Sequence, residues 1–120
     1  MAFVAYALPI LPGQAGRAGH FGTELTPEFR ERYEHLNRGA NVRRHMEWVQ
    51  PTPMGDFLVV VFESDTPEKM NRAFEDNAYD RWWRDRVHAV HGFDPGDPNF
   101  HPVMPALTFD WHDEVSTGHS

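Results

Sequence analysis

The stretch Phe57-Leu58-Val59-Val60-Val61-Phe62-Glu63 decides the fold, because it holds six consecutive apolar residues before its first charge. Most of these residues are β-branched or aromatic, and turn-forming residues enclose the stretch at 54–56 and 64–67. This composition predicts a central strand that is buried on both faces. In a chain of 120 residues, helices would cover one face, and a second sheet or a partner subunit would cover the other.

The length of the chain favours one domain with one modest core. We predict a domain over residues 1–112 and a flexible C-terminal tail over residues 113–120, where the sequence becomes polar. An apolar sheet face left in water would forfeit much of the stability available to so small a domain. Oligomerisation is therefore expected from size alone.

Composition argues against several functional classes. The 18 acidic and 11 basic residues give a net charge of -7, so the overall field repels a phosphate backbone and no nucleic-acid partner is expected. The chain has no cysteine, which excludes disulfides, thiolate metal sites and a cysteine nucleophile. No apolar run approaches the roughly 18 residues of a membrane span, and the first residues lack the charge pattern of a signal peptide. We expect a cytoplasmic protein without a membrane partner.

Three further strands are predicted around the central one. An uncharged apolar run predicts a second central strand at 3–8, whereas charges on both faces predict an edge strand at 42–50. Apolar residues that alternate with smaller or polar ones predict a last edge strand over 103–111.

Two helical regions begin with the same signal, Thr-Pro-Glu, at 26–28 and at 66–68. The first is expected to be stopped by Gly39 and Asn41. The second is expected to break at Asp76-Asn77 and to end at His91-Gly92, where the glycine supplies a left-handed cap. Each region would cover the sheet with its apolar stripe.

The resulting order, β-α-β-β-α-β, predicts an α+β, ferredoxin-like fold. We expect a four-stranded antiparallel sheet in the order 4-1-3-2 with the helices on one face, and within it the first and third strands side by side and parallel. Residues 13–22 carry a glycine at every third position, so it stays open whether they form a weak helix or a mobile loop.

Three motifs carry a resemblance to known proteins, namely Glu47-Trp48-Val49-Gln50-Pro51-Thr52-Pro53-Met54-Gly55-Asp56-Phe57, Tyr79-Asp80-Arg81-Trp82-Trp83 and His91-Gly92. Together with its architecture, the chain resembles the dimeric α+β barrel superfamily, which includes antibiotic-biosynthesis monooxygenase-like, EthD-like and stress-responsive barrel groups. Within the superfamily, the motifs look like those of a bacterial family to which no function has been assigned. The resemblance implies a homodimer whose two sheets pack face to face and close a barrel.

The resemblance also implies a ligand cavity between helices and sheet, but it does not select an activity. Members of the superfamily oxidise polycyclic phenols without a cofactor, degrade haem, isomerise lactones or only bind a ligand. The haem-degrading and phenol-oxidising members use an asparagine on the first strand, where this chain offers Tyr6. Those activities are not carried over to this chain, and no cofactor is assigned.

His45 and His91 are the candidate catalytic residues. His45 and Glu47 are two apart on a strand and share a face, so they could act as a base with its orienting partner or as two metal ligands. An ordinary polar pair on an edge strand is the alternative. His88 and His91 have the spacing of a helical metal pair, but we expect His88 to face solvent and His91 to cap the helix end. No metal site is assigned.

Four tryptophans in so short a chain predict an aromatic pocket suited to a planar ligand. Trp82 is of most interest, because Trp83 already occupies the apolar stripe of its helix. The alternative is that these rings serve the core and the dimer contact. The predicted ligand pocket consists of His45, Trp48, Trp82, His91 and Tyr6.

Three functions follow as hypotheses, and whether the protein is an enzyme stays open. The first is a homodimer that binds a small, partly aromatic ligand between helices and sheet. The second is a cofactor-independent monooxygenase or isomerase, with His45 or His91 as proton acceptor and a Tyr or Arg stabilising the anion formed. The third is a structural dimer without a ligand.

Overall fold

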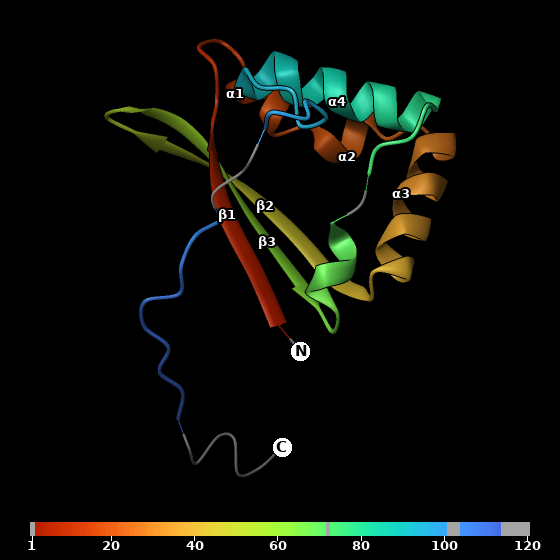
Figure 1. The fold of residues 1–120 in the computed structure, drawn as a ribbon. Coiled ribbons are helices and arrows are strands. Elements are labelled where there is room, and N and C mark those ends of the chain that lie inside the picture. The colour runs from red at the N-terminus through yellow and green to blue at the C-terminus, as the bar shows by residue number, and fades with distance from the viewer. Residues whose placement is uncertain (1, 72, 101–103, 114–120) are drawn as a thin grey trace.

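The computed structural model describes residues 2–71, 73–100 and 104–113 of the chain (Figure 1). Among these residues, no helix combines the length and the apolar character that a membrane crossing requires. The predicted tail at 113–120 lies outside the described residues except for its first position. The elements, in chain order, are β1 (Ala2–Pro9), α1 (Ala15–Ala18), α2 (Phe21–Glu24), α3 (Pro27–Gly39), β2 (Val42–Thr52), β3 (Gly55–Ser64), the 3-10 helix η1 (Pro67–Met70) and α4 (Ala78–His91).

The sheet is antiparallel, and its strand order is β1-β3-β2. The central position of β3 confirms the prediction from its apolar run. Val60 of β3 lies opposite Tyr6 of β1 on one side and opposite Glu47 of β2 on the other. The prediction that the first and third strands are parallel is wrong. A helical crossover returns β2 in the direction of β1, and the tight hairpin at its end then reverses β3.

The predicted last strand at 103–111 has no counterpart in the described part of the chain. Residues 104–113 have no regular secondary structure, and residue 103 lies outside the described residues. Leu107 and Phe109 are each 81% exposed, on a segment that extends away from the sheet (Figure 1). Within the described residues β1 is therefore an edge strand, and the four-stranded order stays a prediction.

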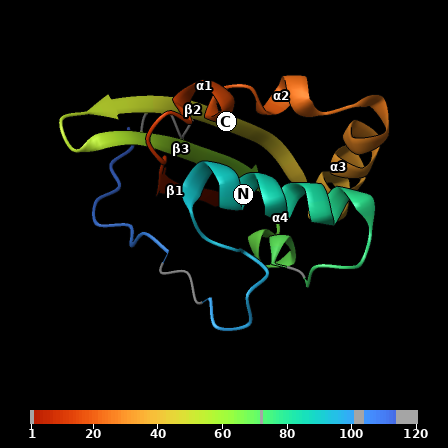
Figure 2. The same ribbon diagram turned by 90° about the horizontal axis from the view of Figure 1, so that it is seen from above.

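The first predicted helix is confirmed as α3. The Thr26 hydroxyl caps it by accepting a hydrogen bond from the Phe29 amide at 3.3 Å, and Pro27 occupies the first helical position. The helix ends at Gly39, as expected. In Figures 1 and 2, α3 lies at the right-hand side of the molecule, where it contacts β2.

The predicted break in the second helical region is also confirmed. Among the described residues before the break, the region contains only the short η1 helix. Helix α4 begins after Asn77, whose side-chain oxygen accepts a hydrogen bond from the Asp80 amide at 2.8 Å. The helix ends at Gly92, whose φ of 85° is the left-handed cap expected there. Residues 13–22, left open by the sequence, contain all of α1 and begin α2, two helices of four residues each.

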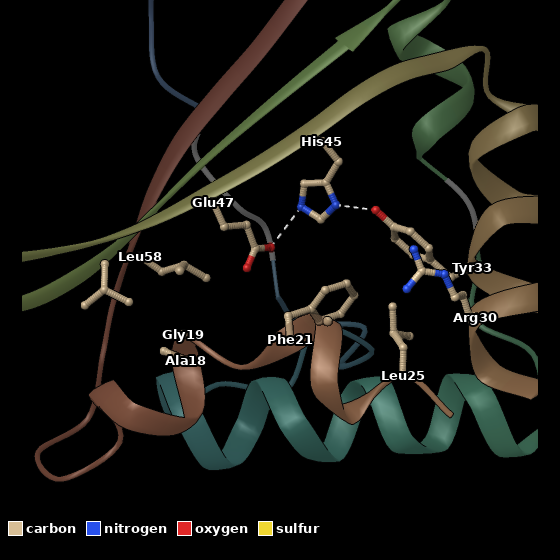
Figure 3. A pocket seen from close by; sticks show the side chains of 11 residues that line it. Ala18, Gly19, Phe21, Leu25, Arg30, Tyr33, His45, Glu47 and Leu58 are labelled. Carbon is tan, nitrogen blue, oxygen red and sulfur yellow. Dashed lines mark hydrogen bonds and ion pairs between the residues drawn. The ribbon is translucent and has the colours of Figure 1, made fainter. Parts of the chain in front are cut away.

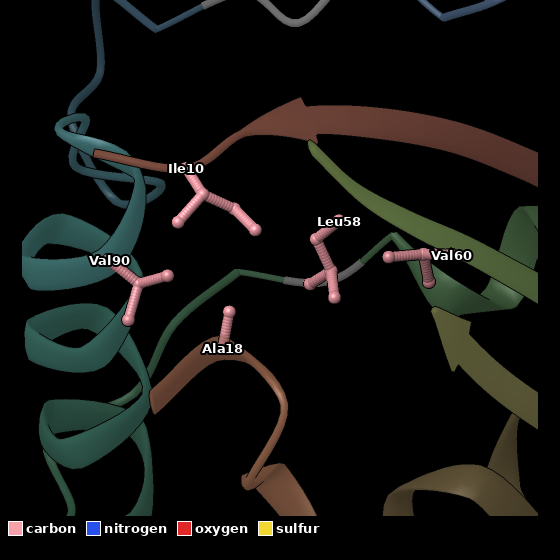
Figure 4. Close-up of a cluster of buried hydrophobic side chains, with 5 residues drawn as sticks. All are labelled: Ile10, Ala18, Leu58, Val60 and Val90. Carbon is pink, nitrogen blue, oxygen red and sulfur yellow. The ribbon is translucent and has the colours of Figure 1, made fainter. Parts of the chain in front are cut away.

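The core lies between the helices and one face of the sheet. Five buried side chains from β3, α1, α4 and the residue after β1 form it, namely Ile10, Ala18, Leu58, Val60 and Val90 (Figure 4). The opposite face of β3, with Val59 and Val61, is only partly buried. On the same open face, Phe3 is 68% exposed and Trp48 is 50% exposed. A single chain thus covers one face of the central strand, and not both faces.

Candidate functional site

A hydrogen-bonded chain of three side chains lies on the helix-covered face of β2 (Figure 3). The Tyr33 hydroxyl of α3 is 2.6 Å from His45 Nδ1, and His45 Nε2 is 2.9 Å from Glu47 Oε2. His45 and Glu47 share one face of the strand, as their spacing predicts. The side chain of His45 is largely buried. The three hydrogen-bonded side chains therefore belong to the interior of the domain and are not an ordinary polar pair at the surface.

Aromatic packing holds the imidazole of His45 in place. Its ring stacks on Phe62 of β3, with centroids 4.1 Å apart and planes 14° apart. Phe21 of α2 meets both the His45 ring and the Tyr33 ring edge-on, at 5.8 and 5.5 Å. The imidazole is therefore held by ring contacts as well as by its two hydrogen bonds.

The protonation states of the three groups follow from their surroundings. Burial raises the pKa of the Tyr33 phenol, and the nearby Asn37 side chain opposes this rise in part. The phenol stays protonated at neutral pH and can donate to Nδ1 of a neutral His45. In its neutral form the imidazole then carries its proton on Nε2 and donates it to the Glu47 carboxylate.

A pocket of about 290 Å³ opens beside this hydrogen-bonded chain (Figure 3). It is of the size that a small ligand needs, at the lower end of typical ligand sites. Its wall combines aromatic and aliphatic side chains with two charged groups, Arg30 and Glu47. The lining residues are Ala18, Gly19, Phe21, Gly22, Leu25, Arg30, Tyr33, His45, Glu47, Val49 and Leu58.

Of the predicted pocket residues, His45 lines this pocket and Trp48 lies on the opposite face of the sheet. Tyr6 lies on β1, which β3 separates from the strand of His45. Its ring stacks on Phe62, with the two ring centroids 6.5 Å apart. Burial, with a smaller contribution from the Glu47 charge, raises the pKa of Tyr6 to about 12. Trp82 contacts Phe21 at 6.0 Å, so it supports the pocket wall from behind.

His91 is not brought together with His45. It is buried at the end of α4, where its Nδ1 is 2.8 Å from the Pro9 carbonyl oxygen and its ring stacks on Phe93. Burial lowers the pKa of His91, so at neutral pH the uncharged ring donates Nδ1–H to that carbonyl and ties the helix to the end of β1. His88 faces solvent, as expected.

Sequence reasoning missed Phe21, Leu25 and Arg30. Arg30 precedes Tyr33 by three residues on one helix, and this spacing places the two side chains on one face. The spacing could have identified Arg30 as a neighbour of Tyr33 in the pocket. Phe21 lies within the glycine-rich segment at 13–22 and Leu25 just after it, and no local pattern assigns them to a pocket.

A buried ion pair between Arg86 and Glu24 lies behind Phe21, on the side of this ring that faces away from the pocket. The side chain of Arg86 is only 2% exposed, and it donates to Glu24 at 3.0 Å and to the Arg17 carbonyl at 2.8 Å. Its guanidinium also lies 5.2 Å from the centre of the Phe21 ring. Hydrogen bonds from Arg17 and Arg86 lower the pKa of Glu24, with the Arg17 bond as the larger cause. This cluster attaches α1 and α2 to α4.

Among residues 2–71, 73–100 and 104–113, no group of three or more histidine, aspartate or glutamate side chains is arranged to hold a metal ion. A scan against protein-family models, a search of curated proteins and a search of solved structures each find no match to this chain. The fold itself defines a small α+β protein with an antiparallel three-stranded sheet, which is compatible with a ferredoxin-like topology.

Proposed function

We propose that this chain forms a homodimeric, ferredoxin-like α+β barrel whose pocket binds a small, partly aromatic ligand. The dimer is supported by the open sheet face, which no helix in the described part of the chain covers. Its apolar surface includes Phe3, Trp48, Val59 and Val61. A second copy that packs the same face against it would bury both surfaces at once.

The four-stranded order belongs to the same proposal. Helix α4 ends beside β1, because the Leu11 amide donates to the Val90 carbonyl at 2.8 Å and His91 contacts Pro9. The chain therefore leaves α4 near the Pro9 end of β1, and the segment at 104–111 comes after this point in the sequence. A strand that starts there and runs along the outer edge of β1 is antiparallel to it, which gives the order 4-1-3-2.

Analytical ultracentrifugation at micromolar concentration tests the dimer. We expect twice the chain mass for the wild type, and a single chain mass for Trp48→Glu, because this change buries a charge in the contact. Met54→Glu is the matched control, since Met54 is 91% exposed at the hairpin turn and should leave the dimer intact. A wild type with the mass of one chain contradicts the proposal.

The ligand site is carried by one observation, the chain from Tyr33 through His45 to Glu47 on the wall of a pocket of about 290 Å³. The polar groups of this mixed polar and apolar pocket can fix the orientation of a ligand, and the Phe21 ring offers a surface for an aromatic one. A pocket of this size beside fixed polar groups favours a ligand-binding dimer over a structural dimer with filled pockets.

Amide chemical shifts measured by NMR during titration with a panel of small aromatic compounds test the site. We expect saturable changes clustered at Phe21, Tyr33 and His45. Leu25→Trp, which fills the pocket, should abolish them, whereas Leu107→Trp on the exposed segment should not. Changes that scatter over the surface, or that survive in Leu25→Trp, contradict ligand binding in this pocket.

The second candidate function is catalysis of a proton transfer, as in an isomerase or a cofactor-independent monooxygenase. It is favoured by the fixed imidazole of His45, which has a carboxylate on one nitrogen and a phenol on the other. Turnover of a compound identified by the NMR titration, and its loss in His45→Phe, would support this function. Equal turnover in His45→Phe would remove His45 from the chemistry.

A further inference from the structure

We propose that Tyr33, and not His45, exchanges a proton with the ligand, and that the ligand is a planar acid with an ionisable phenolic or enolic hydroxyl. This inference rests on the proposed ligand site and names the chemistry of its occupant. The starting observation is that both ring nitrogens of His45 are already engaged, Nδ1 by Tyr33 and Nε2 by Glu47. Neither nitrogen is free to take a proton from a ligand directly.

Among the residues that line the pocket, Tyr33 carries the hydroxyl group, which can both donate and accept a hydrogen bond. Tyr33 can donate its own proton to a neutral His45. Its oxygen has two lone pairs, of which the Asn37 side chain engages one, so the other can accept a hydrogen bond from a ligand hydroxyl. Hydrogen bonds join the Glu47 carboxylate, the His45 imidazole and the Tyr33 phenol, and all three residues line the pocket. A proton accepted at one end can be passed toward the other.

The transfer balances without any further reactant. The ligand O–H bond breaks and its proton forms a new bond to Tyr33 Oη, while the original Tyr33 proton moves to His45 Nδ1. The ligand keeps the electron pair as an oxyanion, and Tyr33 is again a neutral phenol. His45 becomes an imidazolium, which donates to the Glu47 carboxylate over the existing 2.9 Å contact.

The charges around the pocket fit an anionic product. Arg30 is the cation among the lining residues, and its own partner Glu34 is shared with Arg38. The Glu47 carboxylate would repel an anion, but the imidazolium formed in the transfer offsets this charge. Glu24, behind Phe21, is held by Arg17 and Arg86. The guanidinium of Arg30 is therefore the group available to a ligand oxyanion.

The shape of the wall adds the requirement for a planar molecule. Phe21 stands edge-on to Tyr33 and His45, and its ring forms one side of the pocket beside these two residues. A flat ring fits such a surface by stacking or by an edge contact. The pocket volume of about 290 Å³ limits the ligand to a small one.

Two related probes test the inference. 4-Nitrophenol has an ionisable hydroxyl and changes colour on ionisation, whereas 4-nitroanisole has the same ring with the hydroxyl methylated. We expect 4-nitrophenol to bind at least tenfold more tightly than 4-nitroanisole, and the bound probe to be more ionised than the free probe at the same pH. Binding is followed by equilibrium dialysis and ionisation by absorbance.

Two variants then assign the effect to residues. Tyr33→Phe keeps the ring and should reduce 4-nitrophenol affinity about tenfold while leaving 4-nitroanisole unchanged. Arg30→Gln should remove the excess ionisation of the bound probe and weaken binding about fivefold. Arg38→Gln is the matched control, because it removes the same charge from the same helix and the same partner but does not line the pocket.

The outcomes separate this inference from the proposed site. Equal affinity for the two probes, or full 4-nitrophenol binding in Tyr33→Phe, overturns the role of Tyr33 while ligand binding stands. Binding of neither probe, together with an NMR titration that finds no aromatic ligand in the pocket, overturns both. Equal effects of Arg30→Gln and Arg38→Gln would show a general charge effect and remove Arg30 from the site.

Discussion

Replacing Arg86 by methionine perturbs the buried ion pair on which the pocket wall depends. The change removes the hydrogen bonds to Glu24 at 3.0 Å and to the Arg17 carbonyl at 2.8 Å, but it keeps an unbranched stem beside Phe21. A hydrogen bond to a charged group contributes about 1.5 to 3 kcal/mol, and one to a neutral carbonyl contributes about 1 kcal/mol. Removing the desolvation cost of the guanidinium offsets part of this loss.

Glu24 is not left unpaired in this variant, because Arg17 still binds both of its carboxylate oxygens, at 3.0 and 3.2 Å. We therefore expect Arg86→Met to lower the free energy of unfolding by about 2 kcal/mol, less than the roughly 3 to 5 kcal/mol of a fully orphaned charge. Urea denaturation followed by tryptophan fluorescence measures this value.

Arg84→Met is the matched control on the same helix. Its pair with Asp94 lies at the surface, with both side chains about 40% exposed, so the loss of stability should be much smaller. A double-mutant cycle of Arg86→Met with Glu24→Gln should give a coupling energy of about 1 kcal/mol or more. Equal stability of the Arg86 and Arg84 variants, or zero coupling with Glu24, would refute the structural role of the buried pair.

Two further predictions concern the end of α4. Gly92→Ala should lower the free energy of unfolding by about 1 to 2 kcal/mol in urea denaturation, because the left-handed φ of 85° is strained for alanine and its Cβ would lie 3.1 Å from Leu11. Gly39→Ala, which meets no atom within 4 Å, should instead be neutral or slightly stabilising. Burial lowers the pKa of His91, so the stability linked to this group is present above its unfolded pKa of about 6.5 and is lost as the pH falls through the lower folded pKa. His91→Gln should lose less stability than the wild type between neutral pH and about pH 5, and identical pH profiles would contradict the assignment.

The fold was predictable where its signals are local. The apolar run at 57–62 identifies the central strand without knowledge of any distant contact, because a continuous run of apolar neighbours is typical of a buried strand. Thr26 and Gly92 mark helix ends through bonds within one turn, and the break at Asp76-Asn77 is equally local. The direction of β1 relative to β3 was mistaken, since it depends on how the connections turn the chain: the helical crossover keeps β2 in the direction of β1, and the hairpin then reverses β3.

The candidate site was predictable only in part. His45 and Glu47 are two residues apart, so their common face follows from strand geometry. Tyr33 is 12 residues from His45, and Arg86 is 62 residues from Glu24, so both pairings depend on tertiary packing. Trp48 shows the same limit, because an aromatic residue suits a pocket wall and an open sheet face equally well.

The most direct test of the account is the tautomer of His45, measured from the nitrogen chemical shifts of its ring in isotope-labelled protein at neutral pH. For the neutral imidazole we predict the proton on Nε2 and an unprotonated Nδ1 that accepts the Tyr33 hydrogen bond, and in Tyr33→Phe the Nδ1 signal should shift as this bond is lost. A proton on Nδ1, or an Nδ1 shift that is unchanged in Tyr33→Phe, would contradict the hydrogen-bonded chain and the role of Tyr33 built on it.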